Sequence, residues 1–242
     1  MKHKILEKNI VYGNKVDEGS FAEVYKGIYN GEDICIKRYF DQCLPDFYDE
    51  KRMKLLCEMN KDVSSDIILP MYILQKGDKT LGYISRLIEN KSDFYSFFSN
   101  MSLNDKIKYL TDVKELINKM HSYGIVHGDI HGGNVIFDEN NKPCIIDFDN
   151  CSIGDCQIDK HMTSDLVEKY LYYNDIGKDV DVFKFNILTY AVLNDVSTIF
   201  VRREINNNNF GIFNTKDEID ICKCAGEVRK TNEYLIDYVR TR

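Results

Sequence analysis

The first ninety residues contain short runs in which apolar and polar side chains alternate, and turn-forming residues separate these runs. Alternation with a period of two is typical of strands that bury one face. Such runs cover residues 10–12, 21–29, 34–36, 67–74 and 81–88. Asn30-Gly31 joins the second run to the third and favours a hairpin turn. Residues 46–60 place apolar side chains at helical spacing, so five strands and one helix are predicted here.

Beyond residue 93 the apolar positions recur every three or four residues, which is typical of amphipathic helices. The clearest helical run opens at Ser102 and ends near Met120. Further helical runs cover about residues 179–201 and 226–240. The second part of the chain is therefore predicted to be mainly helical.

The change of pattern near residues 89–92 predicts two packed lobes, at residues 1–89 and 90–242. The first lobe is expected to be a five-stranded antiparallel sheet with one helix, which makes the fold class α+β. Hydrophobic residues make up 43% of the 242 residues, which is enough to form a core and excludes wholesale disorder.

The net charge and the cysteine content indicate which binding partners and which cellular compartment are expected for this chain. The formal net charge of −7 argues against nucleic acid as the main partner. No apolar run approaches the roughly 18 residues that a membrane span needs, and no signal-peptide core follows the first residues. The eight cysteines include no Cys-x-x-Cys pair, so we expect free thiols in a reducing compartment, the cytoplasm or a host cytosol.

Three polar residues have a spacing that suits phosphoryl transfer, a reaction that depends on positioned hydroxyls and metal-held phosphates. Asp129 and Asn134 lie five residues apart in a glycine-rich stretch, residues 125–137. Asp147 ends an apolar strand, where a carboxylate is costly without a partner. Carboxylate and amide oxygens are the hard ligands that Mg²⁺ prefers.

These residues resemble the catalytic machinery of the protein kinase-like superfamily. His127-Gly128-Asp129 with Asn134 resembles the catalytic loop, and Asp147-Phe148-Asp149 resembles the metal-binding Asp-Phe-Gly. The resemblance implies a bilobal kinase fold and a chain that uses ATP with Mg²⁺, or Mn²⁺. It implies Asp129 as the catalytic base and Asn134 and Asp147 as metal ligands.

Further motifs follow in the expected order over about residues 10–200. Residues 17–24 resemble the glycine-rich phosphate loop, although only Gly19 of its glycines remains. Lys37 resembles the phosphate-binding lysine, Glu50 the helix glutamate that fixes it, and residues 181–188 the helix beneath the catalytic loop. By this resemblance the ATP site is formed by Val16, Gly19, Ser20, Val24, Cys35, Lys37, Glu50, Ser85, Arg86, Ile88, His131 and Ile136.

Several positions depart from the protein-kinase pattern. Asp17 and Ala22 replace two loop glycines, Gly128 stands where many protein kinases carry Arg, and His131 stands where they usually carry Lys. Asp149 replaces the glycine of Asp-Phe-Gly. His131 and Asp149 are more similar to small-molecule kinases of the aminoglycoside phosphotransferase type.

Three functions therefore remain open at the level of sequence. A Ser/Thr protein kinase is favoured by residues 181–188, and a small-molecule kinase is favoured by His131 and Asp149. A pseudokinase scaffold is favoured by Asp17 and Ala22. It is opposed by the retained catalytic and metal-binding residues, Lys37, Asp129, Asn134 and Asp147. Because 242 residues is short for a complete kinase, we place the shortening in the helical lobe after about residue 200.

Overall fold

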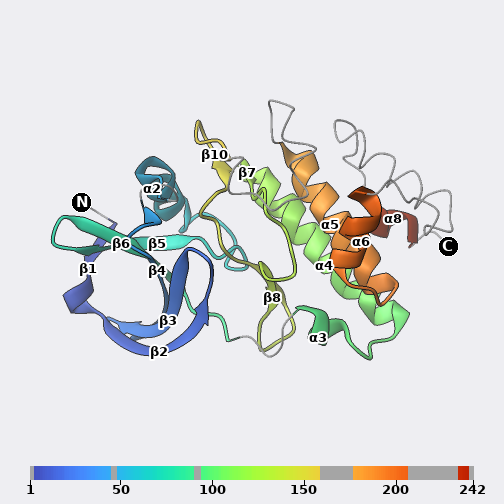
Figure 1. Cartoon of the computed structure of the whole chain (residues 1–242), viewed down its shortest axis with the longest axis horizontal. Coiled ribbons are helices and arrows are strands. Elements are labelled where there is room, and N and C mark those ends of the chain that lie inside the picture. Colours follow the sequence, from blue (N-terminus) through green and yellow to red (C-terminus); the bar gives the residue numbers. More distant parts are fainter. Residues whose placement is uncertain (1–2, 45–47, 90–93, 159–176, 207–233, 240–242) are drawn as a thin grey trace.

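The computed structural model describes residues 3–44, 48–89, 94–158, 177–206 and 234–239. A twisted sheet with one helix forms one lobe, and a group of helices forms the other (Figure 1). Short paired strands lie between the two, and they carry the segments with the catalytic-loop motifs. The predicted α+β class is therefore confirmed. The predicted lobe boundary adjoins residues 90–93, which lie outside the described part.

The N-terminal lobe contains one six-stranded sheet with the order β1-β5-β6-β4-β3-β2. Its strands are β1 (Lys4–Leu6), β2 (Val11–Glu18), β3 (Ala22–Tyr29), β4 (Glu32–Tyr39), β5 (Pro70–Lys76) and β6 (Lys79–Arg86). A 3-10 turn, η1 (Glu7–Asn9), follows β1. All five predicted strands are present and pair antiparallel. The sixth strand, β1, was not predicted, and it pairs parallel with β5.

The hairpin between β3 and β4 sets the register of the strand that carries Lys37. Asn30 and Gly31 have φ values of 52° and 82°, which fit the two-residue turn that their sequence favours. The resulting register places Lys37 opposite Val24 on β3 and opposite Tyr83 on β6. Because side chains alternate along a strand, Ile34 and Ile36 enter one core while Cys35 and Lys37 face the other way.

Helix α2 (Glu50–Met59) begins directly after Asp49, which caps it, and residues 46–47 of the predicted helix lie outside the described part. Asp49 has an extended backbone, and its carboxylate accepts the amides of Lys51 and Arg52 at 2.9 and 3.1 Å. Aspartate is a strongly preferred residue at this position. Four residues of the helix are buried: Arg52, Met53, Leu56 and Cys57.

The second lobe is built around two long helices. α4 (Leu103–Ser122) buries one face, which includes Leu110, Val113, Ile117 and Met120. α5 (Lys178–Leu193) is buried on almost every side. The single helical run expected over residues 179–201 forms two helices. The first ends at Leu193, and Asp195 then has a left-handed φ of 53°, which interrupts the helical conformation. The shorter helices are α3 (Phe94–Phe98), α6 (Thr198–Asn206) and α8 (Leu235–Val239).

Two predictions about the end of the chain fall largely outside the described residues. The expected helix over residues 226–240 is described only as α8, and the expected shortening of the lobe concerns residues 207–233. Among the described residues, no helix is both long and apolar enough to cross a membrane. The six cysteines in this part of the chain are free thiols, as predicted.

Four short strands support the segments with the motifs: β7 (Ile125–Val126), β8 (Val135–Phe137), β9 (Pro143–Ile145) and β10 (Ser152–Ile153). β7 pairs with β10 and β8 with β9. Phe137 of β8 stacks on Phe97 with ring centroids 3.7 Å apart, and Phe94 and Phe98 pack around it. This aromatic cluster anchors the strand that directly follows Asn134.

Candidate active site

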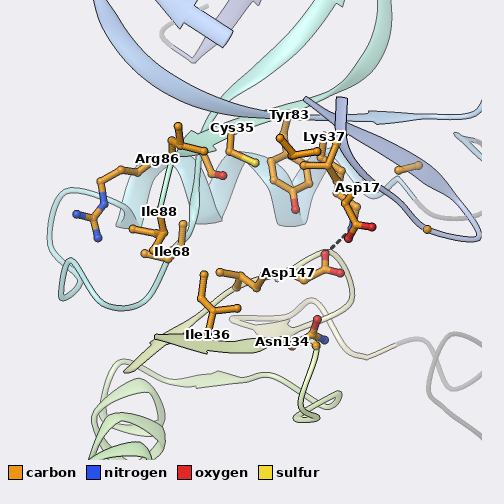
Figure 2. Close-up of a pocket in the computed structure, with 18 of the residues that line it drawn as sticks. Asp17, Cys35, Lys37, Ile68, Tyr83, Arg86, Ile88, Asn134, Ile136 and Asp147 are labelled. Atoms are coloured by element: carbon orange, nitrogen blue, oxygen red, sulfur yellow. Dashed lines mark hydrogen bonds and ion pairs between the residues drawn. The ribbon is translucent and has the colours of Figure 1, made fainter. Parts of the chain in front are cut away.

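A cavity of about 740 Å³ lies between the sheet and the two motif segments (Figure 2). It brings together residues that are far apart in the sequence, from the β2–β3 loop, β4, β6 and the catalytic loop. The predicted site residues that line it are Val16, Gly19, Ser20, Val24, Cys35, Lys37, Ser85, Arg86, Ile88, Asp129, His131, Asn134, Ile136 and Asp147. Glu50 does not line it.

One end of the cavity is an apolar slot. Cys35 lies above it and Ile136 below it, and Ile68 and Ile88 close one side (Figure 2). Ile68 and Ile146 were not identified from the sequence, because they carry no motif and join the cavity only through the tertiary fold. An apolar slot of this kind suits a flat aromatic ring.

Lys37 lies at the polar end of the cavity with two carboxylates. Its ammonium pairs with Asp147 Oδ1 and lies 2.8 Å from Asp149 Oδ2. Burial alone would lower the pKa of Lys37, but the charges of Asp147 and Asp149 outweigh it and raise the pKa above its ordinary value. Lys37 is therefore a fixed cation at neutral pH.

The expected pairing of Glu50 with Lys37 does not occur in this structure. Because Asp49 caps α2, Glu50 occupies the first turn and its carboxylate faces solvent. It lies 3.2 Å from the Lys4 ammonium and 2.9 Å from the Lys54 ammonium. The buried face of α2 carries Arg52 instead. The placement of Glu50 in the ATP site is thus corrected by the structure.

Backbone and side-chain hydrogen bonds join the two motif segments. The Ile146 amide donates to the Asn134 carbonyl at 3.0 Å, and His127 Nε2 contacts the Ile146 carbonyl at 2.9 Å. Phe148 is fully buried and packs edge-on against His127. These contacts hold Asp147 on the same side of the cavity as Asn134.

Asp129 is held by two nitrogen-bearing side chains. Its Oδ1 lies 2.6 Å from Lys184 Nζ, and its Oδ2 lies 3.4 Å from His131 Nε2. Burial alone would raise the pKa of Asp129, but the His131 hydrogen bond and the Lys184 charge outweigh it and hold the pKa well below its usual range. Asp129 is therefore ionised at neutral pH.

Lys184 was missed at the level of sequence. It lies on α5, and its side chain is only 1% exposed. The available signal was a lysine inside the strongly apolar segment 180–192, since lysine is rarely buried without a partner. A lysine in such a segment predicts that a buried anionic partner exists, but the sequence does not identify that partner.

Asp181, also on α5, fixes the catalytic-loop backbone. Its carboxylate is fully buried and accepts the amides of His127 and Gly128 at 2.8 and 2.7 Å. His121 Nε2 lies 2.8 Å from the same carboxylate. A buried carboxylate with several hydrogen bonds gives the loop a fixed conformation.

Gly128 combines a left-handed backbone with little space for a side chain. Its φ is 76°, and an added Cβ would lie 2.4 Å from Cδ1 of the buried Ile158. We expect Gly128→Ala to lower the free energy of unfolding by about 3 kcal/mol, from left-handed strain and overpacking together. Gly124 has a similar φ of 75° with open space around it, so Gly124→Ala should cost only about 1 kcal/mol. Denaturant unfolding would measure the free energy of unfolding of both variants. If the two substitutions lowered it equally, the proposed clash with Ile158 would be contradicted.

Asn134 and Asp147 fit a magnesium site. Asn134 Nδ2 donates to the Asp129 carbonyl at 3.0 Å, so its amide oxygen remains for a cation. Lys37 outweighs the effect of burial and lowers the pKa of Asp147, so this carboxylate is charged. Among the described residues no group of three or more His, Cys, Asp or Glu side chains forms a metal cage. Mg²⁺ is typically bound by one or two carboxylates together with substrate phosphates, which agrees with this sparse ligand set.

Comparison with known proteins agrees with this geometry. A probable LIM domain-containing serine/threonine-protein kinase of Dictyostelium discoideum is 24% identical over 206 residues, covering 78% of this chain and 20% of that protein. A G-type lectin S-receptor-like serine/threonine-protein kinase of Arabidopsis thaliana is 27% identical over 199 residues, which cover 74% of this chain and 23% of that protein. The chain therefore spans about a fifth of the length of these relatives.

The family model of the protein kinase domain matches residues 10–235. This range includes strands β2 to β6 of the sheet, the residues that line the cavity and the helices that hold the catalytic loop. The chain therefore belongs to the protein kinase domain family.

Proposed function

We propose that this protein transfers the γ-phosphate of ATP to a serine or threonine hydroxyl of a protein. The observation that carries the proposal is the convergence of Lys37, Asp129, Asn134 and Asp147 on one cavity with an apolar slot. The slot suits the adenine ring, and the polar end suits the phosphates. The names of the relatives, which are serine/threonine-protein kinases, support a protein hydroxyl as the acceptor.

Each polar residue has a distinct task in this proposal. Lys37 provides a fixed positive charge for the phosphates, and Asp129 accepts the hydrogen bond of the attacking hydroxyl and orients it. Asn134 and Asp147 would hold Mg²⁺, which supplies neutralisation of phosphate charge when bound. Lys184 and His131 hold the Asp129 carboxylate in place.

One position bears on the alternative of a small-molecule acceptor. Asp149 was one of the two residues that favoured a small-molecule kinase. Its side chain is only 11% exposed, and it contacts Lys37 and Tyr39. Its carboxylate therefore serves these two contacts rather than an acceptor, while the likeness of the Asp-Phe-Asp motif and of His131 to small-molecule kinases remains a feature of the sequence.

The proposal is tested by offering both classes of acceptor at once. The purified chain would be incubated with γ-labelled ATP, Mg²⁺ or Mn²⁺, casein as a generic protein acceptor, and a mixture of aminoglycosides. We expect label on casein or on the chain itself. Label on the aminoglycosides alone would contradict a protein acceptor, and no label at all would contradict catalysis.

Lys184→Met tests the contact that positions Asp129. Without the ammonium 2.6 Å away, the buried Asp129 carboxylate should become harder to ionise and less well placed. We expect kcat to fall about 10- to 100-fold, in line with the loss of a positioned catalytic geometry. The acid limb of the pH profile should also move to higher pH, because the lost Lys184 charge is one of the interactions that lower the pKa of Asp129.

The matched control is Lys114→Met. Lys114 also pairs with an aspartate, Asp237 of α8, at 2.7 Å. Neither residue lines the cavity, and α8 lies at the end of the helical lobe that is away from the sheet (Figure 1). This variant should keep both kcat and the pH profile of the wild type. An unchanged pH profile in Lys184→Met would show that Lys184 does not act through Asp129.

A further inference from the structure

Asp149 provides Lys37 with a second carboxylate. Its Oδ2 lies 2.8 Å from Lys37 Nζ and accepts a hydrogen bond from the Tyr39 hydroxyl at 2.7 Å. Lys37 and Tyr39 lie two residues apart on β4, so both side chains leave the same face of the sheet. The Asp149 carboxylate therefore bridges two adjacent positions of this strand.

Helix α2 also contacts Asp149, through the backbone of this residue. Arg52, which is 5% exposed, donates from Nη1 to the Asp149 carbonyl at 2.7 Å. Its Nη2 donates to the Gln157 carbonyl at 2.6 Å. The planar guanidinium thus holds both ends of residues 149–157 against α2.

Lys37 needs a partner that does not also bind the metal. Of its two carboxylates, Asp147 is the proposed magnesium ligand, and a carboxylate bound to a cation is a weaker partner for a lysine. Glu50 faces solvent on the first turn of α2 and does not reach Lys37. Asp149 is then the carboxylate that can keep Lys37 in place while Asp147 serves the metal.

We propose that Asp149 and Arg52 act as positioning residues that together connect α2 to Lys37, in place of a carboxylate on the helix itself. In this link Arg52 fixes the backbone of Asp149, and the Asp149 carboxylate fixes the Lys37 ammonium. The inference rests on the proposed function, because Lys37 matters through its charge at the phosphates. It predicts that a displacement of α2 changes the position of Lys37 through residue 149.

The test compares Asp149→Asn and Arg52→Met with a matched control in the same segment. Asp155 also pairs with an α2 residue, Lys51, but at 3.4 Å and with its side chain 92% exposed. A pair as exposed as this contributes little, so Asp155→Asn should behave as the wild type. Arg52→Lys is added as a milder variant, because it keeps the charge but loses the planar fork.

We expect Asp149→Asn and Arg52→Met each to lower kcat/KM for ATP by about 10- to 100-fold. Part of the loss should be a higher KM for ATP, while KM for the protein acceptor stays constant. Partial unfolding would lower kcat alone, and melting curves would report it independently. The double variant should be no worse than the more affected single variant, because both residues act through one link.

Four results would overturn the link. The first is an Asp149→Asn enzyme that matches Asp155→Asn, and the second is a fall in kcat with an unchanged KM for ATP. The third is recovery of Asp149→Asn at high Mg²⁺, which would make Asp149 a metal ligand. The fourth is a large fall in kcat/KM for ATP in Glu50→Gln, with no such fall in Asp149→Asn. A wild-type chain without transfer would instead contradict the proposed function.

Discussion

Replacing Asp129 with Asn is expected to lower kcat by about 10²- to 10⁴-fold, the usual contribution of a positioned general base. Asparagine keeps the shape of the side chain but cannot accept the proton of the attacking hydroxyl. Asp129 lies at the polar end of the cavity, away from the apolar slot, so the affinity for ATP should change little. Steady-state kinetics and calorimetric titration with ATP would measure the two quantities separately.

The stability of this variant needs its own control. Asp129→Asn leaves the buried Lys184 ammonium without its carboxylate, and loss of one partner of a buried pair costs about 3 kcal/mol or more. The double variant Asp129→Asn with Lys184→Met removes both charges and should recover part of the melting temperature without recovering activity. Substantial transfer by a folded Asp129→Asn protein would remove Asp129 from the role of base.

Replacing Asp147 with Asn is expected to abolish the effect of Mg²⁺ on ATP binding. In the wild type, Mg²⁺ should tighten ATP binding, because Asp147 and Asn134 supply oxygen ligands beside the phosphates. Asparagine is the appropriate replacement because Asp147 has a φ of 70°, a left-handed conformation that Asn adopts at a lower cost than Ala. Titrations with and without Mg²⁺ would give the ratio of the two dissociation constants, and this ratio should fall to near one.

Asp149→Asn is the informative comparison for this prediction. Both aspartates pair with Lys37, so both substitutions remove a carboxylate from the same ammonium. Only Asp147 is proposed to bind the metal, and Asp149→Asn should therefore retain the dependence of ATP binding on Mg²⁺. An Asp147→Asn protein that keeps the wild-type ratio would contradict the metal assignment.

The local features of the first lobe could be predicted from the sequence because they depend on neighbouring residues. Asn30-Gly31 determines a turn, the turn determines the register of β3 and β4, and the register places Lys37 opposite Val24. Strand β1 could not be predicted in this way. It has three residues, and its partner β5 lies about seventy residues further along the chain.

The partners of charged residues depend on the tertiary fold and not on spacing. The family resemblance suggested that Glu50 pairs with Lys37, although their separation in sequence is somewhat short for the family. In the structure α2 begins at Glu50, directly after the Asp49 cap, and the Glu50 carboxylate faces solvent. Lys184 lies 55 residues from Asp129, and Asp149 lies 110 residues from Tyr39. In both cases the sequence shows a charged residue at an unusual position, and only the tertiary structure shows which group is its partner.

The most direct test of the kinase assignment is transfer of label from γ-labelled ATP by the wild-type chain, followed by analysis of the phosphorylated amino acids. With Mg²⁺ or Mn²⁺ present, we expect label on serine or threonine of casein or of the chain itself, and Asp129→Asn should reduce it to near background. A folded wild-type chain that binds ATP but transfers no label to any hydroxyl would contradict the account.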